Sequence, residues 1–437
     1  MKQLIHKYNH QETLLMVSLY PKKGELYSAG TSGVASYAKN VVKNMERRVV
    51  VLADVLDKPD IYEEDNVLVY RCFKRNSLLM WLQIVKAIYQ FSSVKNILVQ
   101  LDFAMYGSVV TTSLVIPFLA FLKIFEYRTN VIMHHVVTDI FKLKGHVGLG
   151  EGFLDIIKGF IFNKLFHAFY LLLSIFTIKI IVLEDVLRER LGRIISKEKI
   201  VTIPHGVDTD IKEIEKFEAR KRLGIPRDDC FVLFFGYVNW FKGADFFVEA
   251  FKDVHKILGK KAHFIIAGGK SPTLKDRGFY QKYFGRVLEN IYDSHNIQIT
   301  GYVPQDEIGV YFSATDLVVL PYRNFMTASG VFSLVFSYNK PFIVSGELGE
   351  MFDESDFKQV FGAVGLRKEN IVFDLTQKSC LAVTEEVLKD GLKSKMKNAT
   401  QIIRRDRSYR NIAILFEILI IAPNVTFQKR LQLSYTR

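Results

Sequence analysis

The sequence predicts an α/β protein with two doubly wound domains, and three observations support this. Short runs of β-branched and other apolar residues alternate with amphipathic segments along the chain. Such continuous apolar strands, separated by helical segments, are typical of parallel sheets with helices on both faces. The alternation restarts near Ile203-Pro204, which indicates a second array. The length of 437 residues fits two domains better than one core.

The first half of the chain contains five apolar runs that predict strands. A loop that contains glycine follows the first run, and an amphipathic segment at residues 34–45 predicts the helix after it. The strands are expected at residues 14–19, 49–52, 97–100, 131–133 and 180–183.

The second half contains five further runs of the same kind. Helices are predicted between them, from about residue 244 to 258 and from about residue 280 to 294. The strands are expected at residues 231–235, 263–267, 297–299, 317–320 and 341–344. Two successive β-α arrays place the domain boundary near residues 200–210.

Composition limits the class of partner. Hydrophobic residues make up 49% of the chain and charged residues 24%, which is a globular composition. The net charge of +13 favours anionic partners, such as a phosphorylated ligand or an anionic membrane surface. No run of basic and aromatic residues resembles an RNA-binding signature, so no nucleic-acid partner is expected.

Cysteine spacing and the N-terminal residues indicate a reducing compartment. Cys72, Cys230 and Cys380 are far apart and form no CxxC pair, so neither a disulfide framework nor a structural zinc site is expected. The first residues lack the apolar core of a signal peptide. We therefore expect a cytoplasmic protein.

Two segments of the first half are more apolar than a soluble sheet domain requires. The first covers residues 109–125 and is interrupted by Pro117 and Lys123. The second covers residues 160–183 and carries Lys164, His167 and Lys179. The longest uninterrupted run, residues 168–178, is shorter than the roughly 20 residues that span a bilayer. Three interpretations stay open: a helix at the membrane interface, a buried helix, and a spanning helix.

Several polar or glycine-containing loops follow predicted strands, where the ligand crevice of an open α/β sheet lies. In the first half these are the loop at residues 21–34 and the pair His134-His135, which could hydrogen-bond a sugar or a phosphate. In the second half, Lys242 stands just before a helix, and Ser329-Gly330 opens another. A lysine and helix N-terminal amides together suit a diphosphate. Ala267-Gly268-Gly269 permits a close backbone approach.

Taken in order, these motifs resemble the retaining glycosyltransferases of the GT-B fold, family 4. The resemblance covers nearly the whole chain and is strongest at residues 200–345. Its motifs are IPHGVD at residues 203–208, FFGYVNWFKGAD at 234–245, IIAGG at 265–269, GYVPQDEIGVYFSATDLVVLPY at 301–322 and SGVFSLVFSYNKPFIVS at 329–345.

The resemblance implies a cleft between two Rossmann-like domains, with the nucleotide-diphosphate sugar bound mainly by the second. Lys242 is then expected at the diphosphate, with the Ser329 and Gly330 amides around a phosphate. Val303 is expected beside the base, and His134 at the reacting sugar as the catalytic residue. The remaining donor-site residues are Gly33 and Gly268. The implied domains are residues 1–204, residues 205–400, a crossover helix at 401–425 and a basic tail at 426–437.

Three positions depart from the family pattern. Tyr237 stands where the family usually has an arginine, and Met326 and Leu334 stand where two glutamates are common. The resemblance implies retention without a protein nucleophile, in which the leaving diphosphate takes the acceptor proton. A lysine and helix dipoles can hold the diphosphate without a cation, so no metal or other cofactor is predicted.

Two functions are therefore weighed. The first is a transferase, with a hexose as the expected sugar, that acts on a glycan or lipid-linked acceptor in polysaccharide biosynthesis. It would be a peripheral protein on the inner face of the plasma membrane. The second is a catalytically silent GT-B protein that binds a sugar nucleotide or organises a glycan-assembly complex. The apolar residues at 326 and 334 favour the second, and Lys242, Ser329-Gly330 and His134 favour the first.

Overall fold

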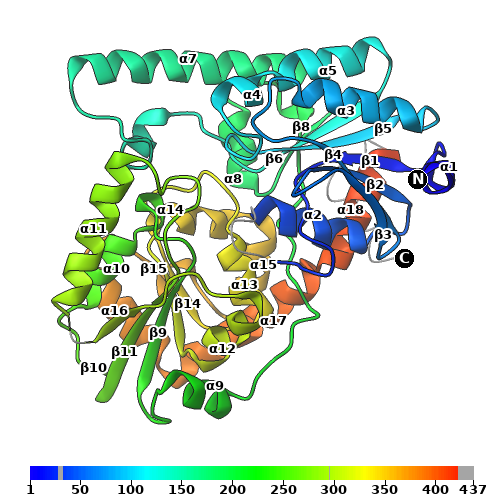
Figure 1. The fold of residues 1–437 in the computed structure, drawn as a ribbon. Helices are drawn as coiled ribbons and strands as arrows, with labels where there is room; N and C mark the ends of the chain where they lie inside the picture. Colours follow the sequence, from blue (N-terminus) through cyan, green and yellow to red (C-terminus); the bar gives the residue numbers. More distant parts are fainter. Residues whose placement is uncertain (28–32, 295, 422–437) are drawn as a thin grey trace.

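A computed structural model describes residues 1–27, 33–294 and 296–421 of the chain. It contains two α/β domains, the first in blue to green and the second in green to orange (Figure 1). Residues of both domains line the cavities between them. Residues 28–32 of the predicted glycine-containing loop lie outside the described residues, as do residues 422–425 of the predicted crossover helix and the predicted basic tail at 426–437.

The first domain is built on an eight-stranded sheet with the order β3-β4-β2-β1-β5-β6-β7-β8. All neighbours are parallel except β3 and β4. The central strands are apolar on both faces, as a sheet covered by two helical layers requires. The strands are β1 (Leu14–Val17), β2 (Val49–Asp54), β3 (Asp60–Glu64), β4 (Val67–Phe73), β5 (Asn96–Leu101), β6 (Arg128–Met133), β7 (Ile180–Val182) and β8 (Ile200–Thr202).

The β3–β4 hairpin is absent from the predicted strands. Its turn residues, Asp65 and Asn66, have φ angles of 50° and 62°. Two consecutive left-handed residues make the tight turn that joins twisted antiparallel strands, and Asp and Asn tolerate this conformation. The sequence therefore contained a signal for this turn, namely the Asp-Asn pair between two runs of residues with high β propensity.

Helices cover both faces of this sheet. On one face α3, α5 and α7 pack through Trp81, Phe118 and Tyr170. On the other, α2 packs through Tyr37 and Val41. The helices are α1 (Lys2–Tyr8), α2 (Gly33–Lys43), α3 (Met80–Ile88), α4 (Val109–Ser113), α5 (Val115–Ile124), α6 (Lys144–Val147), α7 (Phe153–Phe176) and α8 (Asp185–Leu191), with 3₁₀ turns η1 (Tyr89–Phe91), η2 (Ile140–Leu143) and η3 (Lys197–Lys199).

The second domain is built on a seven-stranded sheet. Its order is β10-β11-β9-β13-β14-β15, and β12 pairs with β11. Only the short β10 runs antiparallel to its neighbour. The strands are β9 (Cys230–Phe235), β10 (Lys256–Ile257), β11 (Lys260–Ala267), β12 (Ile297–Ile299), β13 (Leu317–Leu320), β14 (Phe342–Ser345) and β15 (Val372–Phe373).

The helix predicted to run to residue 258 is shorter than expected. It ends at Phe251, and residues 256–257 instead form β10. Leu258 and Gly259 have φ angles of 49° and 78°, so they form the turn of a hairpin with β11. The helices here are α9 (Lys216–Leu223), α10 (Ala244–Phe251), α11 (Gly278–Tyr292), α12 (Gln305–Ala314), α13 (Gly330–Ser337), α14 (Gly346–Gly349), α15 (Ser355–Val364), α16 (Gln377–Val387) and α17 (Asp390–Asp406), with η4 (Trp240–Lys242), η5 (Glu350–Asp353) and η6 (Lys368–Asn370).

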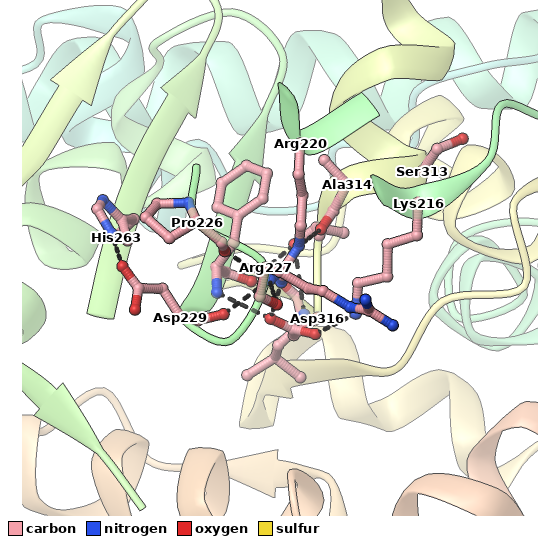
Figure 2. A network of polar contacts seen from close by, with 12 residues as sticks. Lys216, Arg220, Pro226, Arg227, Asp229, His263, Ser313, Ala314 and Asp316 are labelled. Atoms are coloured by element: carbon pink, nitrogen blue, oxygen red, sulfur yellow. Dashed lines mark hydrogen bonds and ion pairs between the residues drawn. The ribbon is translucent and has the colours of Figure 1, made fainter. Parts of the chain in front are cut away.

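A polar network fixes α9 to the amino-terminal ends of the central strands β9 and β13 (Figure 2). Arg220 is buried, pairs with Asp316 and donates to the backbone carbonyls of Ala314 and Asp229. Asp316 also accepts from the Phe231 amide at 2.9 Å, which joins the network to the start of β9. Burial opposes ionisation of Asp316, but its basic neighbours nevertheless hold the pKa of this carboxyl below its usual value. The network is a structural support remote from the cleft.

The chain returns to the first domain at its end through α18 (Tyr409–Ile421). Phe416 and Leu415 pack in the same core as α2. Glu417 accepts hydrogen bonds from the amides of Glu46 and Arg47 at 2.8 and 3.0 Å. The two sheets and this returning helix confirm the predicted fold class, while the predicted helix start at residue 401 falls inside α17.

Candidate active site

The cleft between the domains contains two adjoining cavities with volumes of about 300 and 310 Å³. Both lie where strands of the two sheets end, which is the ligand-binding edge of open α/β sheets. Their walls come from both domains. The residues that line both cavities are Gly33, Tyr37, His205, Tyr237, Lys242 and Gly330.

Lys242 provides the cation of the site. It ends η4, and Gly243 follows with a φ of 72°. A Cβ on Gly243 would lie 2.0 Å from the Pro321 carbonyl oxygen, so only glycine fits this turn. The lysine then folds back over Gly236, where a Cβ would lie 3.0 Å from its Nζ.

The Lys242 ammonium is half-buried and makes no hydrogen bond or ion pair with the residues that the structure describes. Burial lowers its pKa to about 8. A desolvated cation without a counterion is unfavourable in a protein unless a ligand supplies the missing charge. The geometry therefore fits an anion bound between Lys242 and the neighbouring helix N-terminus.

Close backbone packing forms the floor of the first cavity. A Cβ on Gly268 would lie 1.9 Å from the Gly236 carbonyl oxygen, and one on Gly269 would lie 2.9 Å from the Tyr302 amide nitrogen. No side chain therefore fits at either position. Val303 follows as a nearly buried wall residue of the same cavity.

The N-terminus of α13 forms the opposite wall. Ser329 caps the helix, because its Oγ accepts a hydrogen bond from the Phe332 amide at 3.2 Å. The Tyr322 hydroxyl lies 2.8 Å from the same Oγ and fixes its position. Nothing lies within 4 Å of the Cβ position of Gly330. The first turn of α13 is thus open to an anion, which the helix dipole favours.

Two histidines follow β6 in different environments. His134 is buried, with its Nε2 2.6 Å from Oε1 of Gln100 and its ring edge-on to Tyr37. Burial lowers the pKa of His134 to about 3, so the imidazole is neutral. His135 faces the second cavity, and its Nδ1 lies 2.7 Å from Oδ2 of Asp102.

His135 and Asp102 each stabilise the charged form of the other. Burial opposes both charges, but the ion pair outweighs it, so the pKa of Asp102 falls to about 2 and that of His135 is raised. Asp102 directly follows β5, so the rule that places ligand groups at strand ends could have identified it. The sequence analysis singled out His135 but not this partner.

The segment after β6 crosses the cleft. The Val136 amide donates to the Met326 carbonyl at 2.9 Å, and His135 bridges to Thr327. Farther along, α6 presses Gly145 against Trp240, next to Lys242. This crossing also brings His146 to the second cavity, where burial lowers its pKa to about 4.

The seven residues that the sequence singled out all line the cleft. His134 and Ser329 line the second cavity, and Gly268 and Val303 the first. Gly33, Lys242 and Gly330 line both. The three departures also lie here: Tyr237 in both cavities, Leu334 in the first and Met326 in the second. Within the described part of the chain, no group of three or more His, Cys, Asp or Glu residues is arranged to hold a metal ion.

Comparison with known proteins indicates the class of protein to which this fold belongs. Residues 229–357 match the family described as Glycosyl transferases group 1. A sucrose-phosphate synthase from Thermosynechococcus elongatus has a TM-score of 0.68 at 15% identity, over 93% of this chain and 98% of that one. Anabaena HepE, solved in complex with UDP and glucose, has a TM-score of 0.62 at 13% identity, over 95% of this chain and 100% of that one. At identities this low, the two structures show only that the fold is shared, and that fold is GT-B.

Two curated relatives match shorter segments. An uncharacterized glycosyltransferase of Methanocaldococcus jannaschii is 24% identical over 167 residues, which are 36% of this chain and 40% of that protein. The D-inositol 3-phosphate glycosyltransferase of Acidothermus cellulolyticus is 37% identical over 78 residues, 17% of each chain. The chain therefore matches less than half of the length of either relative. Together with the fold, these matches support a GT-B glycosyltransferase.

Proposed function

We propose that the protein transfers a sugar, with a hexose as the expected group, from a nucleotide-diphosphate sugar to an acceptor with retention of configuration. The unpaired, desolvated Lys242 beside the open N-terminus of α13 carries this proposal. A diphosphate in the cleft would receive a charge-assisted contact from the lysine and hydrogen bonds from the amides of Ser329 and Gly330. HepE has been solved with UDP and with UDP-glucose, so a UDP-sugar is the first donor to test.

In the proposed reaction the bond between the sugar and the diphosphate breaks as the acceptor oxygen approaches on the same face. The departing diphosphate oxygen takes the acceptor proton, so no protein nucleophile is needed. Lys242 and the α13 amides stabilise the charge that develops on the diphosphate, which is the larger contribution to catalysis. Neutral His134, held by Gln100 at 2.6 Å, positions the sugar.

The acceptor that we propose is a glycan or a lipid-linked molecule at a membrane surface, in polysaccharide biosynthesis. The exposed apolar helix α7 supports this part of the proposal, because eleven of its large apolar side chains are open to solvent. The corresponding location is cytoplasmic, on the inner face of the plasma membrane.

Met326 and Leu334 favour a second function, a silent GT-B protein that binds a sugar nucleotide. Both line the cavities where the family often carries glutamates, so hydroxyl-binding acids are missing there. A silent protein would bind the donor without consuming it.

Thermal unfolding with a panel of UDP-, GDP- and dTDP-sugars tests the donor, since a ligand that binds only the folded state raises the melting temperature. Release of nucleoside diphosphate, with and without membrane extract as acceptor source, then tests catalysis. Binding together with release supports the transferase. Binding without release under both conditions supports the silent protein, and the absence of binding by every donor rejects both. Lys242→Ala is the matched control for either signal.

A further inference from the structure

Helix α7 leaves an apolar face uncovered. The helix is 24 residues long, and among the described residues it alone is long and apolar enough to cross a membrane by length and composition. Only 17% of its most apolar 18-residue window is buried, which contradicts the interpretation as a core helix. Eleven of its large apolar side chains are exposed: Phe153, Leu154, Ile156, Ile157, Phe160, Ile161, Phe162, Leu165, Leu171, Leu172 and Ile175.

Helix α7 lies along the first domain, and its buried side packs against that domain (Figure 1). Tyr170 and Leu173 are fully buried in the core of the first domain. The Tyr170 hydroxyl accepts from the Val137 amide at 2.9 Å and lies 3.1 Å from the carbonyl of the same residue. Lys123 of α5 donates to the Ile175 carbonyl at 2.8 Å. A spanning orientation would break these contacts, so the helix in this fold lies along a surface.

A basic cavity of about 360 Å³ lies between α7, η2 and the residues that follow α8. Lys142, His167 and Arg193 line it from these three segments. None of the three side chains makes a hydrogen bond or ion pair with another described residue. Asp139 lines the same cavity but already accepts from the Phe141 amide and the Asn163 side chain.

The neighbouring Arg190, by contrast, has an ion-pair partner. Its guanidinium lies 2.7 Å from Glu350, which neutralises it. Glu189, the acid nearest in sequence to Arg193, forms its ion pairs with Lys197 and Arg188, although its charge also acts on Arg193. The cavity therefore presents two exposed cations, Lys142 and Arg193, that form no ion pair with a described residue, and it shares them with the Asp139 carboxylate and with His167 of α7.

We propose that α7 lies on one leaflet of an anionic bilayer and that the basic cavity holds the phosphate of a lipid in that leaflet. Acyl chains match the exposed apolar face, an anionic headgroup matches the charges of Lys142 and Arg193, and the His167 ring can donate a hydrogen bond to it. The net charge of +13 adds attraction over the whole surface. Val109, Val110, Ile124 and Phe125 of the α4–α5 segment are also exposed, and α5 packs against α7.

The cavity also adjoins the cleft. Met326 lines both this cavity and the second cleft cavity, and Val136, which follows His135, lines this one. A phosphate bound there would lie next to the site of the proposed transfer. The inference draws its biological purpose from the proposed membrane acceptor, but its test measures lipid binding and can fail independently of transferase activity.

Flotation of the full chain with liposomes tests the proposal. We expect binding to vesicles of phosphatidylcholine mixed with phosphatidylglycerol, weak binding to phosphatidylcholine alone, and release by high salt or alkaline carbonate. Screening to about 3 Å at 1 M salt removes the electrostatic part. No flotation with the anionic vesicles, or retention through carbonate, overturns the proposal, because retention would mean an integral helix.

Two variant sets separate the apolar face from the basic cavity. Leu165→Glu with Leu172→Glu should abolish flotation, whereas Leu288→Glu, on α11 of the second domain, should not. Lys142→Gln and Arg193→Gln should each weaken binding to the anionic vesicles about fivefold. Lys378→Gln, at an exposed lysine of the second domain, is their control. Equal loss with Lys378→Gln would overturn the cavity as the site, and unchanged melting temperatures establish that the variants are folded.

Discussion

The Nδ1 atom of His135 lies 2.7 Å from Oδ2 of Asp102, so an ion pair joins the carboxyl ends of β6 and β5 at the second cleft cavity. Both side chains are largely shielded from water, with exposed fractions of 24% and 13%. The pair therefore fixes the direction of the His135 ring beside the buried His134. Because His135 carries its positive charge only when it is protonated, the charge in this cavity depends on pH.

Asp102→Asn should lower the free energy of unfolding by about 1.5–3 kcal/mol at pH 6, because it removes a charge-assisted contact. The depressed pKa of Asp102 makes its contribution present above about pH 4 and lost as the pH falls toward 2. The raised pKa of His135 makes its contribution full below about pH 6.5 and lost as the pH rises through that raised value. Urea titrations should therefore give a smaller difference from wild type at pH 9 than at pH 6. An equal difference at both pH values would contradict the ion pair.

Lys242→Ala should weaken donor binding by about 1.5–3 kcal/mol, because a charge-assisted contact to the diphosphate is lost. Isothermal calorimetry with the donor identified by thermal unfolding measures this. Lys340→Ala is a useful control, since burial likewise lowers the pKa of Lys340 to about 8 but its Nζ donates to the Ser313 carbonyl, away from the cleft. Equal donor affinity for wild type and Lys242→Ala would remove the lysine from the site.

Donor affinity should also fall as the pH rises above about 8. In the free protein the Lys242 ammonium loses its proton near that pH, and the diphosphate binds the protonated form. The affinity should then decrease by roughly tenfold per pH unit until the bound lysine also titrates. Lys242→Arg, which stays charged, should remove this dependence. Affinity that is flat between pH 7 and 9.5 in the wild type would show that the lysine does not contact the diphosphate.

His134→Ala should reduce turnover more than donor affinity. The residue belongs to the first domain, whereas the donor nucleotide is expected on the second, so its contact should matter most in the transition state. Comparing kcat with the calorimetric Kd separates the two effects. Gln100→Leu, which removes the 2.6 Å partner of His134, should change kcat in the same direction. A matched loss of affinity with no separate loss of turnover would contradict the role.

Local sequence signals predicted most of the fold, because the strands of a parallel sheet are continuous apolar runs with a strong pattern. They failed where short polar turns decide the structure. Leu258-Gly259 closes a hairpin at the end of a predicted helix, and Asp65-Asn66 closes one where no strands were expected. In the first case turn chemistry outweighed helix propensity in the folded chain. In the second, β3 is half-exposed and lacks a continuous apolar run, so the apolar run of β4 was not recognised as its partner.

The candidate site was predicted where a single residue marks a strand end or a helix start, as Lys242 and Ser329 do. Pairings across elements were not visible, because Asp102 and His135 meet only through the sheet register of β5 and β6. The extent of α7 also escaped prediction. Charges at Lys158 and Lys164 interrupt the apolar run that was read from the sequence, yet the helix tolerates them on an exposed surface.

A buried cluster at the joint of the two domains gives the last prediction. Arg407, between α17 and α18, lies 2.8 Å from Glu184 of the first domain and 2.8 Å from Asp356 of the second. Its guanidinium also lies 3.4 Å from Glu354, whose other oxygen accepts from the Val186 amide at 3.1 Å. One arginine thus connects carboxylates of both domains where the crossover begins.

Arg407→Met should lower the free energy of unfolding by about 3–5 kcal/mol, because it leaves buried carboxylates without a cation. Arg404→Met, which breaks an exposed pair with Glu213 and a hydrogen bond to the Thr209 carbonyl, should cost only about 1 kcal/mol. Burial raises the pKa of Glu184 and Glu354, so the folded state keeps a proton that the unfolded chain releases above about pH 4.5. Stability from this cluster therefore falls as the pH rises from 4.5 through the raised pKa values, and losing the arginine should steepen the fall.

Denaturant titrations should give a larger loss of unfolding free energy for Arg407→Met at pH 8 than at pH 5, and adding Glu184→Gln should recover part of it. A penalty that is independent of pH and unaffected by Glu184→Gln would mean that Arg407 acts through its packing over Phe357, at 4.4 Å from the ring centre, and not through its charge.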